Sequence, residues 1–293
     1  MAKPRELKRR IRSVQNTRKI TKTMELVSTS KLKRAQDRVV GARPYAQALA
    51  DVIGQLYSPE LAERFPLLRQ PTAHTRRTAL VLITSNRGLC GAFNANLIRE
   101  ARRRLEELEA KGTQTELHLV GKKGASFFKF TKRELASQRV DIGDRPTLEH
   151  ARELAAPLME RFAKGELDAV DVVFARFNSA VSTPPTTLRI LPVTPPAVEG
   201  GRGRSKAVNY ILQPSAEAIL QELLPLYVQN QVYRALVETA AAEHGARRTA
   251  MKNATDAGSD MLTILQRTYN RARQAQITQE LAEIVGGAEA LKG

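Results

Sequence analysis

Apolar residues near both ends of the chain recur in a narrow stripe at helical spacing. Near the N-terminus they form two triplets, spaced by four and three residues and separated by a phase slip: Leu7, Ile11, Val14 and Ile20, Met24, Val27. Near the C-terminus they form two runs with the same spacing: Leu262, Leu265, Tyr269, Ala272 and Ile277, Leu281, Ile284, Ala288. A stripe this narrow is typical of a coiled coil. We therefore expect each segment to form a helix that packs against one partner helix.

The placement of proline indicates how long these helices are. No proline lies between Pro4 and Pro44, and none follows Pro225. Proline ends most helices, so the sequence predicts helices over about 5–43 and 226–286. They would span roughly 60 and 90 Å, whereas a globule of this length is about 50 Å across. We therefore expect the two terminal segments to pair as an antiparallel shaft that projects from a central domain.

The central part alternates between strand and helix signals. The run at 78–84 is continuously apolar, as in a buried parallel strand, and it is followed by a turn and a helix to about residue 111. Three further strands and a helix are expected in order: 116–120, the helix 148–163, 169–177 and 186–193. This alternation predicts a Rossmann-like α/β domain.

The sequence as a whole therefore predicts an α/β protein: a long antiparallel two-helix coiled coil formed by the N- and C-terminal segments, plus a central Rossmann-like α/β domain. The expected divisions are an N-terminal shaft helix in 1–57, the α/β domain in 75–195, a basic linker or loop in 196–212, and a C-terminal shaft helix in 213–293.

The charge is concentrated at the N-terminus. The chain has 47 Lys+Arg and 30 Asp+Glu, a net charge of +17, and residues 1–43 hold 14 basic and three acidic side chains. This stretch is compatible with an acidic protein partner, with nucleic acid, or with a solvated helix face. Stacking aromatics are absent before Tyr45. The longest apolar run, 79–83, is too short for a membrane span, and no apolar region follows the basic start as in a signal peptide.

Motifs for chemistry are weak. Ser85–Gly91 occupies the phosphate-binding position of a Rossmann-like domain but lacks G-x-G-x-x-G, so we expect a tight turn. The GKKG of Gly121–Gly124 resembles the loop of KH domains but follows a strand, so a basic turn is favoured. Cys90, the one cysteine, excludes an internal disulfide and is expected to be a buried small hydrophobe.

The histidines give no metal-binding pattern either. His74, His118, His150 and His244 are far apart in the sequence, and the pairs Glu149–His150 and Glu243–His244 are expected on helix surfaces. The sequence therefore predicts no catalytic residue, no cofactor and no metal site.

Three motifs carry a resemblance to a known family. Residues 10–36, RIRSVQNTRKITKTMELVSTSKLKRAQ, resemble the N-terminal helix of the gamma subunit of the bacterial F-type (F1Fo) ATP synthase. Residues 269–287, YNRARQAQITQELAEIVGG, resemble its C-terminal helix, and residues 83–94, ITSNRGLCGAFN, its central motif. Because the motifs occur in order at both ends and in the middle, the resemblance covers essentially the whole chain.

The resemblance implies a central-stalk rotor that is not itself catalytic. Such a subunit couples rotation of the membrane proton-translocating ring (the c-ring) to ATP synthesis or hydrolysis at the alpha and beta subunits. The implied partners are the alpha and beta collar, the epsilon subunit and the c-ring, with one copy of the chain per complex and no nucleic acid. The implied location is peripheral, on the cytoplasmic side of the cell inner membrane and reached only through partners. The alternatives are a basic coiled-coil nucleic-acid-binding protein and a nucleotide-binding enzyme built on the central domain.

The resemblance also implies contacts between rotor and stator. On the C-terminal helix the implied contacts with beta subunits are Arg273, Gln274, Thr278 and Glu280, with Arg247 as a further functional arginine. On the N-terminal helix, Met24 matches a position that passes an acidic beta-subunit loop, with Lys22, Lys31 and Arg34 as electrostatic partners nearby. The segment Ile277 to Ala288 would act as an axle end in an apolar bearing. The sequence departs from the family near Gly245, where we expect a loosened helix.

Overall fold

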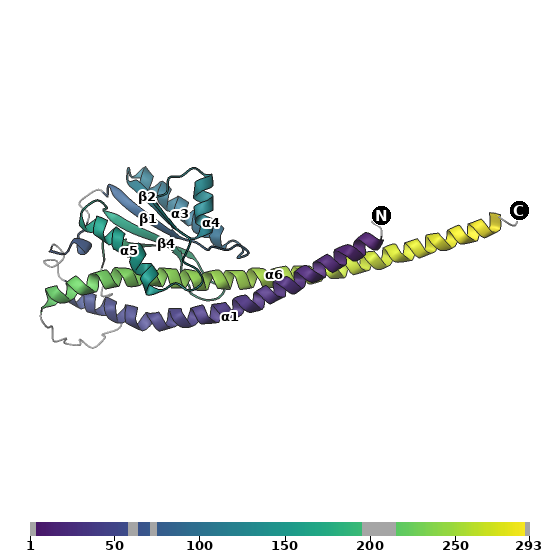
Figure 1. The fold of residues 1–293 in the computed structure, drawn as a ribbon, viewed down its shortest axis with the longest axis horizontal. Coiled ribbons are helices and arrows are strands. Elements are labelled where there is room, and N and C mark those ends of the chain that lie inside the picture. The colour runs from purple at the N-terminus through teal and green to yellow at the C-terminus, as the bar shows by residue number, and fades with distance from the viewer. Residues whose placement is uncertain (1–3, 58–63, 71–74, 195–214, 291–293) are drawn as a thin grey trace. The chain divides into compact units, whose positions relative to one another are not determined.

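The computed structural model describes residues 4–57, 64–70, 75–194 and 215–290. These residues fall into two compact units, 29–246 and the pair of segments 1–28 and 247–293, and each is described by itself. The elements in chain order are α1 (Pro4–Leu56), η1 (Pro66–Leu68), β1 (Arg77–Ile83), α3 (Phe93–Ala110), β2 (Gln114–Val120), α4 (Lys122–Phe130), β3 (Ser137–Arg139), α5 (Leu148–Ala163), β4 (Ala169–Ala175), β5 (Pro185–Leu191) and α6 (Ala216–Ala290) (Figure 1).

The unit 29–246 is built on a five-stranded sheet with the order β3-β2-β1-β4-β5. The first four strands are parallel, and β5 pairs antiparallel with β4. All residues of β4 and all but the first of β1 are buried, as expected for central parallel strands covered on both faces. The short edge strand β3 is not predicted by the sequence, because its three residues, SQR, carry no apolar signal.

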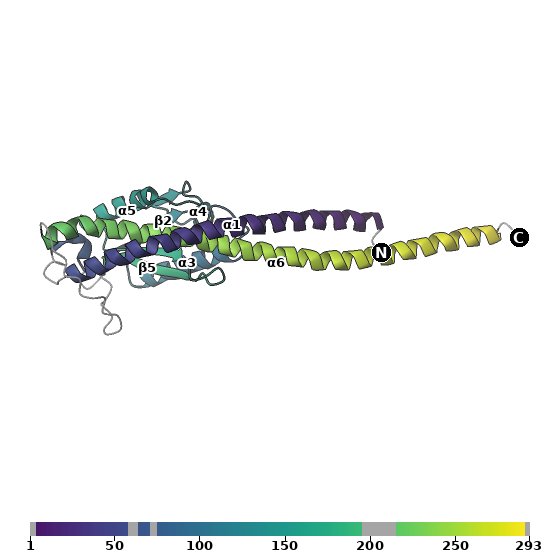
Figure 2. The same ribbon diagram turned by 90° about the horizontal axis from the view of Figure 1, so that it is seen from below.

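Alternate residues of the sheet face two separate cores. Val81 and Ile83 pack with α5, whereas Leu80 and Leu82 pack with α3 and α4. The parts of α1 and α6 that belong to this unit contribute to both cores, for example Ile53 to the first. Figure 1 and Figure 2 together show that these stretches of α1 and α6 run along each other, with α6 nearer to the sheet than α1. The sheet therefore holds both helices by packed apolar side chains.

In the other unit the two helical segments pair antiparallel. The Thr21 and Thr255 hydroxyls are 2.8 Å apart, and Arg18, earlier in the chain, contacts Ser259, later in the chain, with 3.5 Å between Nη1 and Oγ. Gly258 faces Arg18, and a Cβ there would lie 3.5 Å from Cβ of Arg18, an ordinary van der Waals contact. The predicted fold class, paired terminal helices plus a central mostly parallel α/β sheet, is confirmed.

Both long helices extend past the prolines that were expected to end them. α1 continues through Pro44 to Leu56. Pro44 has no N–H, so the carbonyl of Val40 lacks its helical donor. Val40 and Pro44 are both exposed, so water can satisfy that oxygen. Further along the helix, Leu49 and Ile53 are buried. Packing of the following turn thus outweighs the local preference to stop.

The start of α6 also differs from the prediction at 226. The helix begins at Ala216, where Ser215 Oγ accepts the N–H of Ala218 at 3.2 Å, and Pro225 lies inside it. The expected linker 196–212 lies outside the described residues, and the proposed domain boundaries stay predictions. Within the described part of the chain, no helix is both long and apolar enough to cross a membrane.

Two expectations about residues 243–245 were wrong. His244 is 2% exposed and Glu243 8% exposed, so this pair does not lie on a helix surface. Gly245 does not loosen the helix: α6 is continuous through it, and a Cβ there would lie 3.1 Å from the carbonyl oxygen of Ala180. The glycine instead permits a close approach between α6 and the turn that connects β4 to β5.

Candidate functional site

The turn after β1, where a Rossmann-like domain binds phosphate, is closed by the protein's own side chains. Asn94 Oδ1 accepts the backbone N–H of Ser85 at 3.1 Å. Asn86 Oδ1 accepts the N–H of Lys122, the first residue of α4, at 2.9 Å. Anion sites of this kind depend on unoccupied N–H groups at helix N-termini. Because these two N–H groups are used inside the domain, they are not open to a phosphate.

The GKKG segment is also structural, although it is not the expected turn. Lys122–Gly124 form the first turn of α4, and only Gly121 precedes the helix. Gly121 has a φ of 97°, and a Cβ there would lie 2.1 Å from the carbonyl oxygen of Thr84. Thr84 Oγ1 accepts the N–H of Gly124 at 3.0 Å. The two glycines therefore let α4 press its N-terminus onto the end of β1.

Cys90, His118 and His150 make contacts within the domain. Cys90 is buried, as predicted, and its sulfur accepts from Asn94 Nδ2 at 3.2 Å. Burial lowers the pKa of His118, whose Nδ1 lies 2.7 Å from the Ser137 hydroxyl. His150 closes a capping box with Thr147 at the start of α5. His74 lies outside the described residues, and no group of potential metal ligands is found among those described.

A cleft of about 530 Å³ opens at the carboxyl end of the sheet, between the turn after β1, residues 141–146 and α6. Asp144 on its rim forms an ion pair with Lys31 of α1. Burial works against ionisation of Asp144, but the Lys31 ammonium, helped by His244, lowers its pKa overall. Asn86 Nδ2 donates to the carbonyls of Val140 and Ile142, each at 2.9 Å, and so fixes this segment. The ion pair between Asp144 and Lys31 therefore joins this segment of the α/β domain to α1.

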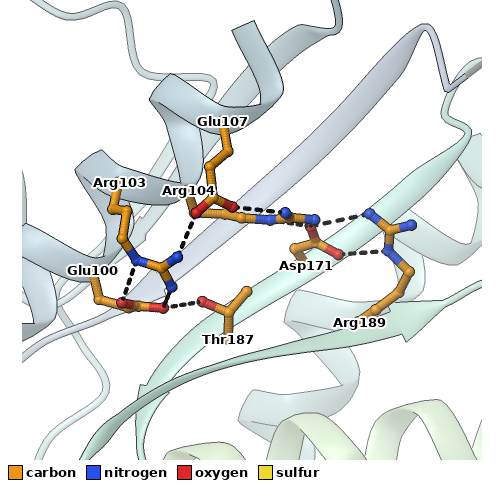
Figure 3. A network of polar contacts seen from close by, with 7 residues as sticks. All are labelled: Glu100, Arg103, Arg104, Glu107, Asp171, Thr187 and Arg189. Atoms are coloured by element: carbon orange, nitrogen blue, oxygen red, sulfur yellow. Dashed lines mark hydrogen bonds and ion pairs between the residues drawn. The ribbon is translucent and has the colours of Figure 1, made fainter. Parts of the chain in front are cut away.

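A second polar network fixes the antiparallel edge strand. Asp171 on β4 is fully buried and accepts hydrogen bonds from Arg104 of α3 at 2.7 Å and from Arg189 of β5 at 2.8 Å. The network continues along α3 and returns to β5 through Glu107, Arg103, Glu100 and Thr187 (Figure 3). Each charge in it is paired inside the domain, so it supports the fold rather than a reaction. Nothing in the sequence pattern pointed to it.

The C-terminal group of predicted contact residues is exposed. Arg273, Gln274, Thr278 and Glu280 lie in a stretch, 273–288, in which every side chain is exposed. The Thr278 hydroxyl donates to the carbonyl of Gln274 at 3.0 Å, and Glu280 accepts from Gln276 at 2.8 Å. These bonds lie within one helix, so the outward faces of the side chains remain available to another chain.

The N-terminal group lies elsewhere on the same unit. Lys22 is exposed and pairs with Glu25 at 3.1 Å, and Met24 is half-buried. Both follow Thr21, which contacts Thr255, so they lie roughly 27 Å of helix away from Arg273. The structure therefore separates the predicted contacts into two groups.

Arg247 is unlike the other predicted contact residues because it is 8% exposed. Nothing in the sequence indicates this burial, since Arg247 lies in a run of small and polar residues, 240–250.

Comparisons with known proteins cover the whole chain. The family model described as ATP synthase matches residues 3–291. Proteins named ATP synthase gamma chain are 62% identical in Gemmatimonas aurantiaca, over 100% of both chains, and 45% identical in Leptospira biflexa, over 99% of this chain and 100% of the relative. The central stalk and c-ring structure of the Tetrahymena thermophila mitochondrial ATP synthase matches with 25% identity and a TM-score of 0.60, over 80% of this chain and 99% of that one. The Euglena gracilis rotor shares the fold at 21% identity and a TM-score of 0.62, over 94% and 98%. The chain therefore belongs to the family of ATP synthase gamma chains.

Proposed function

We propose that this gamma chain transmits force between a rotating membrane ring and the catalytic alpha and beta subunits of the synthase. The chain is the central-stalk rotor of the ATP synthase. The observation that carries the proposed mechanism is the exposure of every side chain in residues 273–288 of α6.

An apolar face on this stretch indicates a protein environment. Ile277, Leu281 and Ile284 are 48%, 57% and 68% exposed, and their spacing of four and three residues places them on one face of the helix. A lone helix is marginal in water, and most helices depend on tertiary packing of such a face. A surrounding collar of alpha and beta subunits would supply that packing while leaving the helix able to turn.

Polar residues lie between the apolar ones. Arg273, Gln274, Thr278 and Glu280 are exposed and would contact the beta subunits. Exposed pairs are worth about 1 kcal/mol or less, so such contacts can form and release at each rotational step. Lys22 and Met24 would form a second contact, with an acidic partner loop. Because Arg247 is buried, we propose that it fixes the position of α6 and does not meet a partner subunit as an exposed charge.

The remaining features of the proposal concern the assembly. The subunit itself carries no catalytic residue, and its closed phosphate turn supports this. Its partners are the alpha and beta subunits, the epsilon subunit and the c-ring, in a complex with one gamma chain. It is peripheral to the cytoplasmic face of the cell inner membrane. No observation supports the alternative of a nucleic-acid-binding protein.

The proposal is tested by reconstitution with alpha and beta subunits. The purified chain alone should hydrolyse no ATP, and its addition should give a complex with one gamma chain and faster ATP turnover. Replacing Ile277, Leu281 and Ile284 together by serine should weaken association, because about 25 cal/mol is lost for each Å² of apolar surface no longer buried. Turnover by the chain alone, or association unchanged by the triple substitution, would contradict the proposal.

A further inference from the structure

The C-terminal end of α4 displays the one exposed phenylalanine of the chain. Phe130 is 86% exposed, whereas the other seven phenylalanines are buried or half-buried. A single exposed apolar side chain is ordinary on a protein surface. Phe130 is distinguished by the rigidity of its position and by the charges around it.

The end of α4 is firmly fixed to the domain. Lys132 adopts a φ of 55° and reverses the chain, so that the N–H of Arg133 donates to the carbonyl of Phe128 at 2.9 Å. The Thr131 hydroxyl donates to the same carbonyl at 3.1 Å. Phe128 is 3% exposed and packs edge-on against Phe127, with 5.3 Å between ring centroids. Phe130 is thus displayed on an anchored turn, and a backbone so held loses little freedom on binding.

The segment around Phe130 is strongly basic. Residues 122–134 hold five cationic side chains and one carboxylate, Glu134. Arg133 is paired with Glu109, but the four lysines form no ion pair within the described residues: Lys122, Lys123, Lys129 and Lys132. A rigid aromatic side chain with charged neighbours is the usual composition of an interface anchor and its polar rim.

We propose that Phe130, with Lys129 and Lys132, docks into an apolar pocket rimmed by Asp and Glu carboxylates on another protein subunit of the synthase. The proposal rests on the proposed function only in that it assumes partner subunits. The complementary charge of the pocket follows from Lys129 and Lys132, which flank Phe130, form no ion pair within the described residues and would be repelled by a basic surface.

A protein partner suits this surface better than a lipid one. A helix that binds a membrane needs a broad apolar face turned outward. In α4 the apolar face that includes Ala125 and Phe128 is buried in the domain, and a single ring remains outside. One ring is enough to fill a pocket but too little to hold a helix in a bilayer.

Site-specific photo-cross-linking in the intact synthase tests the proposal. A benzophenone-bearing phenylalanine is placed at position 130, and the complex is irradiated after co-purification and ATP turnover have been verified. The matched control carries the same residue at Val181, which is 91% exposed but flanked by uncharged Ala180 and Ser182. Position 130 should give an adduct with one other subunit, on a peptide containing Asp or Glu. Lipid adducts alone, no adduct, or the same adduct from position 181 would overturn the proposal.

Charge variants sharpen the same experiment. Lys129→Glu combined with Lys132→Glu should lower the adduct yield several-fold, and so should a rise from low to physiological ionic strength. The melting temperature of the isolated chain should not change, because both side chains are exposed. A yield insensitive to charge and salt would overturn the acidic pocket. Since assembly and turnover are verified first, failure here is distinguishable from failure of the proposed rotor function.

Discussion

Two stretches of the one helix α6 face opposite environments. From Ala235 to Gly245 every residue is buried, including Glu238 and His244, whereas from 273 to 288 every residue is exposed. The helix itself is continuous over both. The buried stretch packs against the chain's own sheet, whereas the exposed stretch has no such packing within the described residues. The comparison therefore separates what the subunit needs in order to fold from what it offers to an assembly.

The largest difference in the free energy of unfolding is expected when a leucine is replaced by alanine in each of the two environments. Leu224 is 1% exposed in the core of the sheet domain, and Leu281 is 57% exposed. Leu224→Ala should lower the free energy of unfolding by about 2–5 kcal/mol, since it removes buried methyl groups and leaves a cavity. Leu281→Ala should leave it nearly unchanged. Denaturant unfolding of the isolated chain measures both, and equal losses would contradict the comparison.

A smaller difference in the free energy of unfolding is expected between variants of two glutamates. Each glutamate accepts a hydrogen bond from the side chain four residues earlier. Glu238 is buried, accepts from Arg234 at 2.6 Å and also accepts the N–H of Phe177 at 3.0 Å. Glu238→Ala leaves that N–H without its acceptor and should cost about 1–3 kcal/mol.

The matched variant is Glu280→Ala, because Glu280 accepts from Gln276 at 2.8 Å on the exposed stretch. It should change the free energy of unfolding by less than about 0.5 kcal/mol. Chemical denaturation of the two variants under identical conditions gives the difference, and a cost for Glu280 as large as that for Glu238 would mean that the tip is covered within the isolated chain.

The sequence revealed the helices and strands better than it revealed this contrast. Apolar spacing and missing prolines indicated two long helices, because those features act locally. Pro44 and Pro225 were misjudged because tertiary packing on either side keeps the helices continuous. Spacing also placed His244 on a surface, since a run such as Ala240–Ala242 appears equally suited to solvent or to close packing.

The candidate contacts were predictable only in part. The exposed group that includes Arg273 and Glu280 came from resemblance, and the structure shows its exposure. Asn86 and Asp171, which fix the domain, gave no sequence signal, because the groups they bind are distant in sequence: Val140, Ile142, Arg104. Long-range polar pairing of this kind requires the fold.

A glycine pair tests how closely α6 is held. At Gly245 a new Cβ would lie 3.1 Å from the Ala180 carbonyl, whereas at Gly286 it would meet nothing within 4 Å. Alanine is favoured over glycine in a helix by about 1 kcal/mol. Gly286→Ala should therefore raise helicity, as measured by circular dichroism. Gly245→Ala should lower the melting temperature, because the turn at Ala180 must move. A higher melting temperature would show that α6 and this turn are not closely packed.

The smallest effect is a pH dependence confined to the sheet domain. Burial lowers the pKa of His118 in the folded chain below its ordinary value of 6.5. The unfolded chain then binds a proton at a higher pH than the folded one, so the stabilisation is fully present above pH 6.5 and declines as the pH falls towards the folded pKa. His118→Gln should flatten the dependence of the unfolding free energy on pH in that range. If the slope between pH 7 and 5 is the same in both proteins, His118 is not its source, and the contrast between the buried and exposed regions does not extend to protonation.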